Sequence, residues 1–211
     1  MAIWYTKWMT DLDKQVIFAY HCDGGQESKL AFSDAVRYCW PVEDRHIPEF
    51  LYYKTDRALK PNRHHAFNIV DGLLVCSPQL RDVLAAHDLG ASRLHRVPIY
   101  ADAEKTPSGL EPHFLLHVTE GKPDTFAPEA SKNVEQFQRE DEKVPRPDAA
   151  WRGRYNQDVL AVRRGSDEGA DLWHDPKLRG RLFASDRLKT AIEAAGIGPK
   201  ELLFHKATIV D

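Results

Sequence analysis

Histidines are the residues most able to do chemistry in this chain, and there are ten of them. His64 and His65 are adjacent, so in an extended chain they point to opposite sides and are poorly placed to chelate one ion together. His113 and His117 stand four residues apart, which would suit chelation on a helix, but the Phe-Leu-Leu between them predicts a strand. None of these spacings matches a zinc signature. We therefore expect no metal site and no cofactor.

Serine and cysteine nucleophiles have no better support. Ser77 and Ser185 lie outside any GxSxG motif, and each precedes a predicted helix that needs a cap. Cys22 adjoins His21, but neighbours in a strand face opposite ways. We interpret the chain as a non-enzyme with no catalytic residue. The alternative is an enzyme of unfamiliar type with a site between two halves of the chain. Its candidate residues are His174, Asp175, His64 and His65.

Two segments resemble each other at an offset of 108 positions. Residues 72–94 read GLLVCSPQLRDVLAAHDLGASRL, and residues 180–202 read GRLFASDRLKTAIEAAGIGPKEL. Each has an apolar run, a serine at the expected helix N-cap, apolar positions with i, i+3, i+4 spacing, and a second apolar run. This pattern predicts an internal duplication, with pseudo-equivalent strand-helix-strand halves at about 1–108 and 109–211.

Composition favours one soluble globular domain over residues 1–211. Hydrophobic residues make up 42% and charged residues 29% of the chain, which is ordinary for such proteins. Many strand-like segments and a few helix-like segments predict the α+β class, with mixed sheets and a few packed helices. A net charge of −3 disfavours nucleic-acid binding, and no apolar run is long enough for a membrane span. Three scattered cysteines and the lack of a signal peptide favour the cytoplasm.

The second segment, with its lead-in, reads DLWHDPKLRGRLFASDRLKTAIEAAGI. It resembles the C-terminal signature of immunity family eleven, a family of bacterial immunity proteins from polymorphic-toxin systems. The stretch GLLVCSPQLRDVLAA and the Val97-Pro98-Ile99 strand resemble the family's middle segment, and FLLHVTEG resembles the strand that opens its second half. The matching positions of the C-terminal signature are Asp171, Trp173, Leu182, Phe183, Ser185, Asp186, Leu188, Ala191, Ile192, Ala195, Gly196 and Ile197.

The resemblance implies an immunity protein of interbacterial competition. Such a protein binds one cognate toxin, encoded by the adjacent gene, and neutralises it in a stoichiometric complex. Many toxins of these systems are nucleases with basic clefts, so an acidic surface would speed association. The candidate toxin-binding residues are Glu135, Glu140, Asp141, Glu142, Asp167, Glu168 and Asp171.

Overall fold

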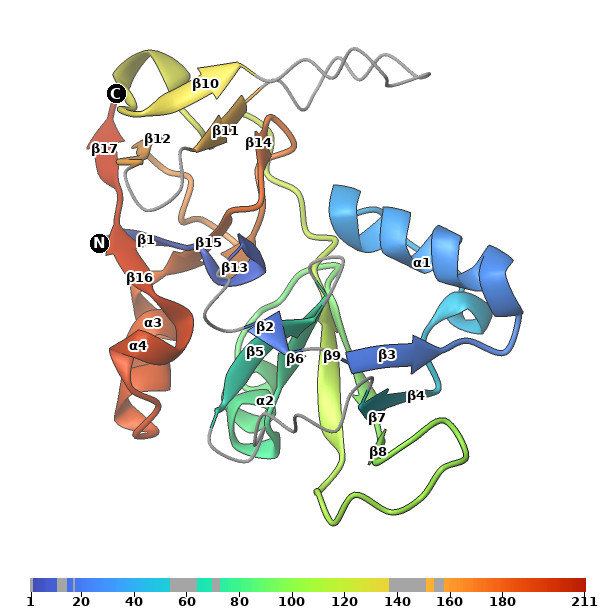
Figure 1. Ribbon diagram of the computed structural model, residues 1–211. Helices are drawn as coiled ribbons and strands as arrows, with labels where there is room; N and C mark the ends of the chain where they lie inside the picture. The colour runs from blue at the N-terminus through green and yellow to red at the C-terminus, as the bar shows by residue number, and fades with distance from the viewer. Residues whose placement is uncertain are drawn as a thin grey trace.

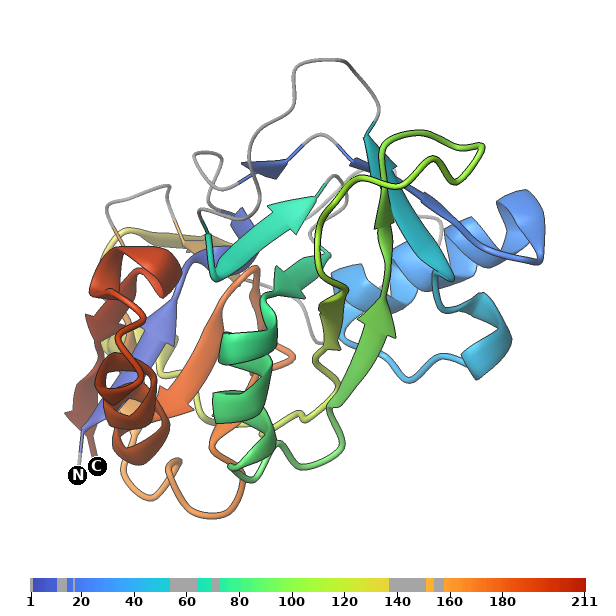
Figure 2. The same ribbon diagram turned by 90° about the horizontal axis from the view of Figure 1, so that it is seen from below.

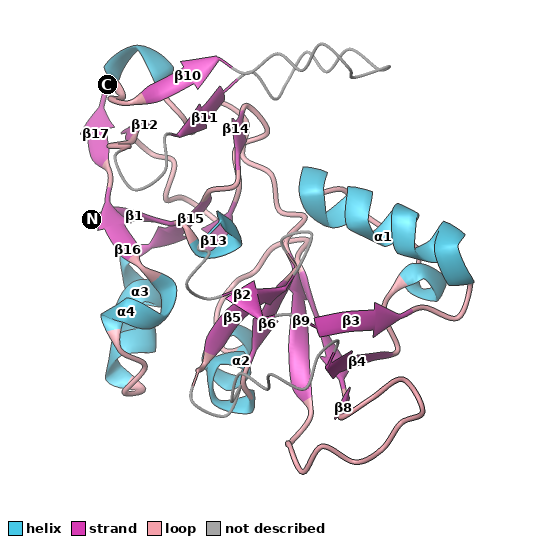
Figure 3. Ribbon diagram, in the orientation of Figure 1, coloured by secondary structure: helices cyan, strands magenta, loops and turns pink. Residues whose placement is uncertain are grey.

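The computed structural model describes residues 2–10, 15–16, 18–53, 64–69, 73–136, 151–153 and 158–211. Helices lie at the periphery of several small sheets, so the predicted α+β class is confirmed (Figures 1 and 3). The helices are α1 (Gly25–Tyr38), α2 (Pro78–Ala85), α3 (Asp186–Ala194) and the short α4 (Pro199–Leu202). Short 3-10 helices cover Trp8–Thr10, Asp44–His46 and Pro128–Ala130. Among the residues described, no helix is both long and apolar enough to cross a bilayer.

Two sheets of similar design form the body of the protein. The first has the strand order β2-β5-β6-β9-β7, and the second has the order β13-β15-β1-β16. The strands of the first sheet are β2 (Gln15–Val16), β5 (Ala66–Ile69), β6 (Leu74–Cys76), β9 (His113–His117) and β7 (Arg93–Val97). Those of the second are β13 (Leu172–Trp173), β15 (Leu182–Ser185), β1 (Ile3–Thr6) and β16 (Phe204–Lys206).

Four strands of the first sheet have counterparts in the second sheet, and the corresponding strands pair in the same way. In the first sheet β6 is antiparallel to both β5 and β9, and Val75 lies opposite Leu115. In the second sheet β15 is antiparallel to both β13 and β1, and Phe183 lies opposite Tyr5. The remaining pairs, β7 with β9 and β16 with β1, are also antiparallel. This correspondence supports the internal duplication, which stays a prediction about the origin of the chain.

Each of these sheets takes an inner strand from the other half of the sequence. Strand β1, near the N-terminus, pairs with β15 and β16 near the C-terminus. Strand β9 lies in the second half of the sequence but pairs with β6 and β7. The N-terminus consequently lies beside the second sheet, whereas the C-terminus lies at the end of β17 (Figure 1). The exchange ties the halves together and makes independent folding of residues 1–108 or 109–211 unfavourable, because each would lack an inner strand.

Smaller sheets extend the correspondence. Strand β4 (Phe50–Tyr53) runs parallel to β8 (Ile99–Tyr100), and β12 (Ala161–Arg163) runs parallel to β17 (Thr208–Val210). Strand β3 (Phe18–His21) completes the sheet of β4 and β8. A further sheet combines β10 (Val134–Gln136), β11 (Trp151–Gly153) and β14 (Leu178–Arg179). The second apolar run of the C-terminal segment forms strands only from Phe204 onward, because Pro199 opens a short helix that ends at Leu202.

Serine caps begin the two equivalent helices, as predicted. The Ser77 hydroxyl accepts a hydrogen bond from the Leu80 amide at 3.2 Å, and the Ser185 hydroxyl accepts one from the Leu188 amide at 3.2 Å. The apolar faces of α2 and α3 then meet in one core cluster that contains Leu80, Leu84, Leu188 and Ile192. Figure 2 shows the two helices side by side under the sheets.

Removal of the caps is expected to destabilise the protein unequally. Ser77→Ala should lower the free energy of unfolding by about 1 kcal/mol, because the cap is lost together with a hydrogen bond to the half-buried His65 ring, which is not a charged carboxylate. Ser185→Ala should lower it by about 2 kcal/mol, because the buried Ser185 hydroxyl also donates to the Asp171 carboxylate. Urea denaturation measures both, and the Ser→Thr variants serve as controls that retain the oxygen. Equal and negligible losses would contradict this account of the caps.

Candidate functional site

The predicted acidic residues have different structural surroundings. Glu135 lies in β10 opposite Arg152 of β11, and its Oε1 atom is 2.6 Å from the Arg152 Nε atom. Such a half-exposed ion pair contributes little to stability, and its acidic charge is already matched. Glu140, Asp141 and Glu142 lie outside the described residues.

Asp171 was wrongly predicted as a partner contact. It is only 2% exposed, and its carboxylate accepts hydrogen bonds from the Ser185 hydroxyl, the Arg187 guanidinium and the Asp88 amide. Burial alone would raise the pKa of Asp171, but the hydrogen bonds from Arg187 and Ser185 outweigh it and hold the pKa below its usual value. Its role is to anchor the start of α3 to the preceding loop.

Asp167 and Glu168 occupy a turn that is held in place. The Lys122 ammonium donates to the backbone carbonyls of Ser166 at 3.2 Å, Glu168 at 2.7 Å and Ala170 at 2.9 Å. The same ammonium lies 3.9 Å from the centre of the Trp173 ring. Glu168 is exposed and Asp167 is half-buried. The turn is therefore a fixed acidic feature that a partner could contact.

The four residues of the alternative enzyme site do not line one pocket. His174 is buried, and burial lowers its pKa to about 4. Asp175 is fully buried and accepts hydrogen bonds from the Phe126 amide at 2.7 Å and the Lys177 amide at 2.8 Å. Both therefore stabilise a packed turn. His64 and His65 instead lie at a surface hollow that contains neither His174 nor Asp175.

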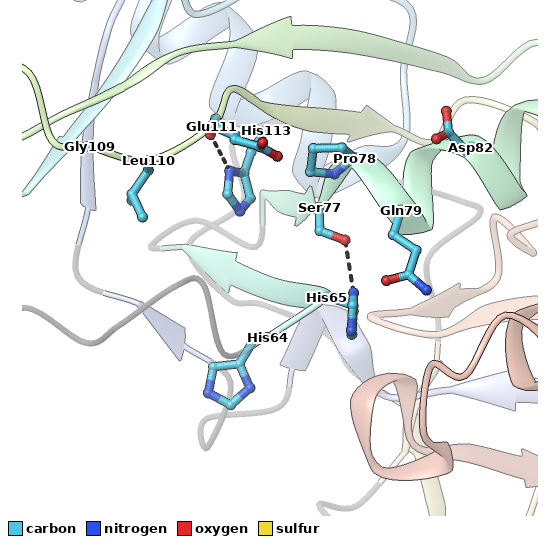
Figure 4. Close-up of a pocket in the computed structure, with 10 residues that line it drawn as sticks. All are labelled: His64, His65, Ser77, Pro78, Gln79, Asp82, Gly109, Leu110, Glu111 and His113. Atoms are coloured by element: carbon cyan, nitrogen blue, oxygen red, sulfur yellow. Dashed lines mark hydrogen bonds between the residues drawn. The ribbon is translucent and has the colours of Figure 1, made fainter.

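This hollow is the main concave feature near the predicted histidines. It encloses about 530 Å³, within the usual range for small-ligand sites. Three segments form its walls: His64 with His65, the first turn of α2, and the residues that lead into β9 (Figure 4). Residues this far apart in the sequence meet because β5, β6 and β9 are neighbours in the first sheet.

The Ser77–His65 pair in the hollow has a structural explanation. The Ser77 hydroxyl lies 3.1 Å from the Nδ1 atom of His65 (Figure 4). In the second sheet, Ser185 pairs in the same way with Asp171 at the equivalent position. The Ser77 and Ser185 amides also donate to the carbonyls of His65 and Asp171, respectively. Both serines are thus helix caps braced by the preceding strand, and this geometry does not single out Ser77 as a nucleophile.

The surroundings of Cys22 also give no support for a nucleophilic role. Its thiol is fully buried, and burial raises its pKa to about 11. The thiol is therefore protonated at neutral pH and poorly reactive. In the part of the chain that is described, no three His, Cys, Asp or Glu side chains are grouped so that they could hold a metal ion.

Sequence reasoning missed the outer face of α1. Leu30 is 58% exposed, and Trp40, just beyond the end of the helix, is 51% exposed. Glu27 and Asp34 lie on the same helical stripe as Leu30, because positions three and four apart share a face. We call Glu27, Leu30, Asp34 and Trp40 the α1 face. The spacing of its members could have been read from the sequence, but their exposure depends on which side of the helix is packed.

Comparisons with known proteins add no family assignment. No protein-family model matches the chain, and no curated protein matches it at a significant level. The resemblance to immunity family eleven therefore stays a prediction.

Proposed function

We propose that this protein is an immunity protein that binds and neutralises a cognate bacterial toxin in a stoichiometric complex. The sequence resemblance suggests this function, and the α1 face is the observation that supports it best. Large exposed apolar side chains at the surface of a rigid element are typical of the residues that dominate binding energy in protein interfaces. The toxin would be encoded by the adjacent gene.

The α1 face is held rigidly from behind. Phe32 and Val36 of α1 are buried in the core cluster that also holds Phe18 and Phe67. The Trp40 amide donates to the Ala35 carbonyl at 2.8 Å, which fixes the chain as it leaves the helix. A side chain presented by a fixed backbone loses little entropy when a partner binds, so Trp40 is well placed as an anchor.

The charge of the α1 face indicates the nature of the partner. Asp23, Glu27 and Asp34 are exposed, and their carboxylates make no ion pair or hydrogen bond with other described side chains. Arg37 is exposed on the same side of the helix, and two further cations lie nearby. Arg45 lines a small hollow with Asp23 and Glu27 but pairs with Glu43, and the Arg179 guanidinium is 5.4 Å from the centre of the Tyr38 ring. A partner with a basic face would be attracted to this surface and would bind it faster at low salt. Nucleases, which bind an anionic backbone, carry such faces.

Substitutions on the α1 face are expected to weaken the complex in two distinguishable ways. Trp40→Ala should raise the dissociation constant by about 30-fold or more, mostly through faster dissociation, because an anchor is lost. Glu27→Lys with Asp34→Lys should slow association by about tenfold at low salt and much less at 0.5 M salt. Surface plasmon resonance with the adjacent gene product measures both rates.

The matched control reverses the other acidic surface, with Asp167→Lys and Glu168→Lys. If the toxin contacts that turn instead, the control will slow association and the α1 variants will not. Co-expression of the wild-type protein with the toxin tests the function itself. Continued toxicity, together with the absence of a complex on size-exclusion chromatography, would exclude the immunity function, whichever surface is used.

A further inference from the structure

The hollow of Figure 4 lies beside the Ser77 cap, and the equivalent Ser185 cap of the second sheet has different neighbours. Gln79 of α2 corresponds to Arg187 of α3. Arg187 bonds the Asp171 carboxylate from the surface beside Ser185, and its side chain is 60% exposed. Gln79 instead donates from its Nε2 atom to the Ala195 carbonyl at 2.6 Å, away from the hollow. The position beside Ser185 thus has a guanidinium of this chain, whereas Gln79 stands at the corresponding position beside Ser77.

The side chains around this space present hydrogen-bond acceptors to it. His113 is only 4% exposed, and its Nδ1 atom lies 2.9 Å from the Glu111 carbonyl. A carbonyl can only accept, so Nδ1 carries the proton and the neutral ring keeps Nε2 as an acceptor. That atom has no partner among the described residues, and in Figure 4 it points into the space between the labelled side chains.

Gln79 and Glu111 add two more acceptors. The amide nitrogen of Gln79 is used by the Ala195 carbonyl, so its Oε1 atom is left, and Figure 4 draws that oxygen on the side of Ser77 and His65. The Glu111 carboxylate lines the hollow and makes no ion pair with another described residue. Leu110 and Pro78 supply apolar surface beside these groups.

We propose that this hollow binds a guanidinium group. A guanidinium is planar, carries only donors, and can satisfy several separately placed acceptors at once, while Glu111 matches its charge. The apolar wall of Leu110 and Pro78 suits the methylene stem of such a ligand. The other carboxylate of the lining, Asp82, is 3.0 Å from the Arg81 guanidinium and is therefore already paired. This site stands on the geometry of the hollow and does not depend on the immunity function.

The guanidinium could come from a free small molecule or from an arginine side chain of a protein partner. Two probes distinguish these sources: agmatine for the small molecule, and N-acetyl-arginine-methylamide for the side chain. Binding is expected at a dissociation constant on the order of 1 mM, as befits a small fragment. Isothermal titration measures the affinity, and the ring resonances of His113 in NMR spectra report the location.

Glu111→Gln should weaken both probes by about tenfold, because the charge of the acceptor is lost. Glu49→Gln, an exposed carboxylate outside the lining, is the control and should leave the affinity unchanged. The lysine analogue should bind about fivefold more weakly than the arginine probe, since an ammonium cannot bridge acceptors in a plane. Binding of the arginine probe alone would assign the site to a partner side chain, and binding of both would allow a free ligand.

The proposal would be overturned by the absence of saturable binding of either probe, or by binding that leaves the His113 resonances unmoved. Equal affinities of the Glu111→Gln protein and the wild type would also overturn it. None of these results bears on the α1 face, because Trp40 is not part of the lining. Loss of toxin binding in Trp40→Ala, with normal probe binding, would conversely leave this site intact.

Discussion

Asp158→Asn is expected to lower the free energy of unfolding by about 3–5 kcal/mol, one of the two largest effects that the structure predicts. The Asp158 carboxylate bridges two buried cations: its Oδ1 atom is 2.7 Å from the Lys7 ammonium, and its Oδ2 atom is 2.9 Å from the Arg181 Nε atom. The side chains of Lys7 and Arg181 are each 3% exposed, and that of Asp158 is 0% exposed. Removing this negative charge takes away an anionic partner that both buried cations share.

The pKa of Asp158 also indicates a strong interaction of its carboxylate with the two cations. Burial alone would raise it, but the hydrogen bonds and charges of Arg181 and Lys7 outweigh burial and hold the pKa below its usual value. The cluster also secures the strand exchange, since Lys7 directly follows β1 while Asp158 and Arg181 belong to the second half of the chain. Loss of the carboxylate therefore weakens the attachment of the N-terminal strand to the sheet near the C-terminus.

Urea denaturation at pH 7.5 measures the effect, and two further variants sharpen it. Asp211→Asn removes the carboxylate of an exposed pair with Arg164 and should change stability by less than about 0.5 kcal/mol. Lys7→Met in the Asp158→Asn background should recover part of the loss, because one of the two cations that Asp158 paired with is gone. A loss below about 1 kcal/mol for Asp158→Asn, or additive effects in the double variant, would show that water solvates these charges.

This cluster illustrates what the sequence could not predict. The helix starts at Ser77 and Ser185 were predictable, because a cap acts within four residues of the chain. The pairing of β1 with β15 and β16 joins opposite ends of the sequence, and no local pattern encodes it. The buried partners of Lys7 follow from that pairing, so the sequence did not predict them either.

The candidate sites likewise differ in how much of each a local sequence pattern predicts. The exposed pattern of Glu27, Leu30 and Asp34 is local, but only packing reveals which face of α1 is free. The hollow unites residues near positions 64, 79 and 111, which come together through the order of strands in the sheet. Asp171 was misassigned because an acidic residue at the end of a polar loop resembles a surface charge in the sequence, whereas here it precedes β13 and braces the Ser185 cap.

The second large effect concerns pH, and His174 is expected to carry much of it. Its ring is buried against the chain around Gly121, and burial lowers its pKa from 6.5 to about 4. An unfolded chain binds the proton at this residue between those two values, and the folded protein does not. Stability should therefore be full above pH 6.5 and fall as the pH drops toward 4, by about 3 kcal/mol from this one residue.

Other buried groups modify this trend in known directions. Burial also lowers the pKa values of His113, His117, His95 and His205, so each adds a loss of the same sign below pH 6.5. Asp175 acts in the opposite direction, because burial raises its pKa and the folded state then gains protons more readily than the unfolded chain.

Comparison of the wild type with His174→Gln isolates the contribution of His174. Unfolding free energies from urea denaturation at pH 8.5, 7.5, 6.5, 5.5 and 4.5 give a pH slope for each protein, and glutamine cannot titrate in this range. The variant should have the shallower slope between pH 6.5 and 4.5, and the curves should run parallel above pH 7.5, whatever the offset in absolute stability. Identical slopes would mean that the imidazole is reached by water and protonates in the folded state. Because His174 adjoins the turn of Asp175 and Lys177, such access would require this turn to open before the rest of the protein unfolds.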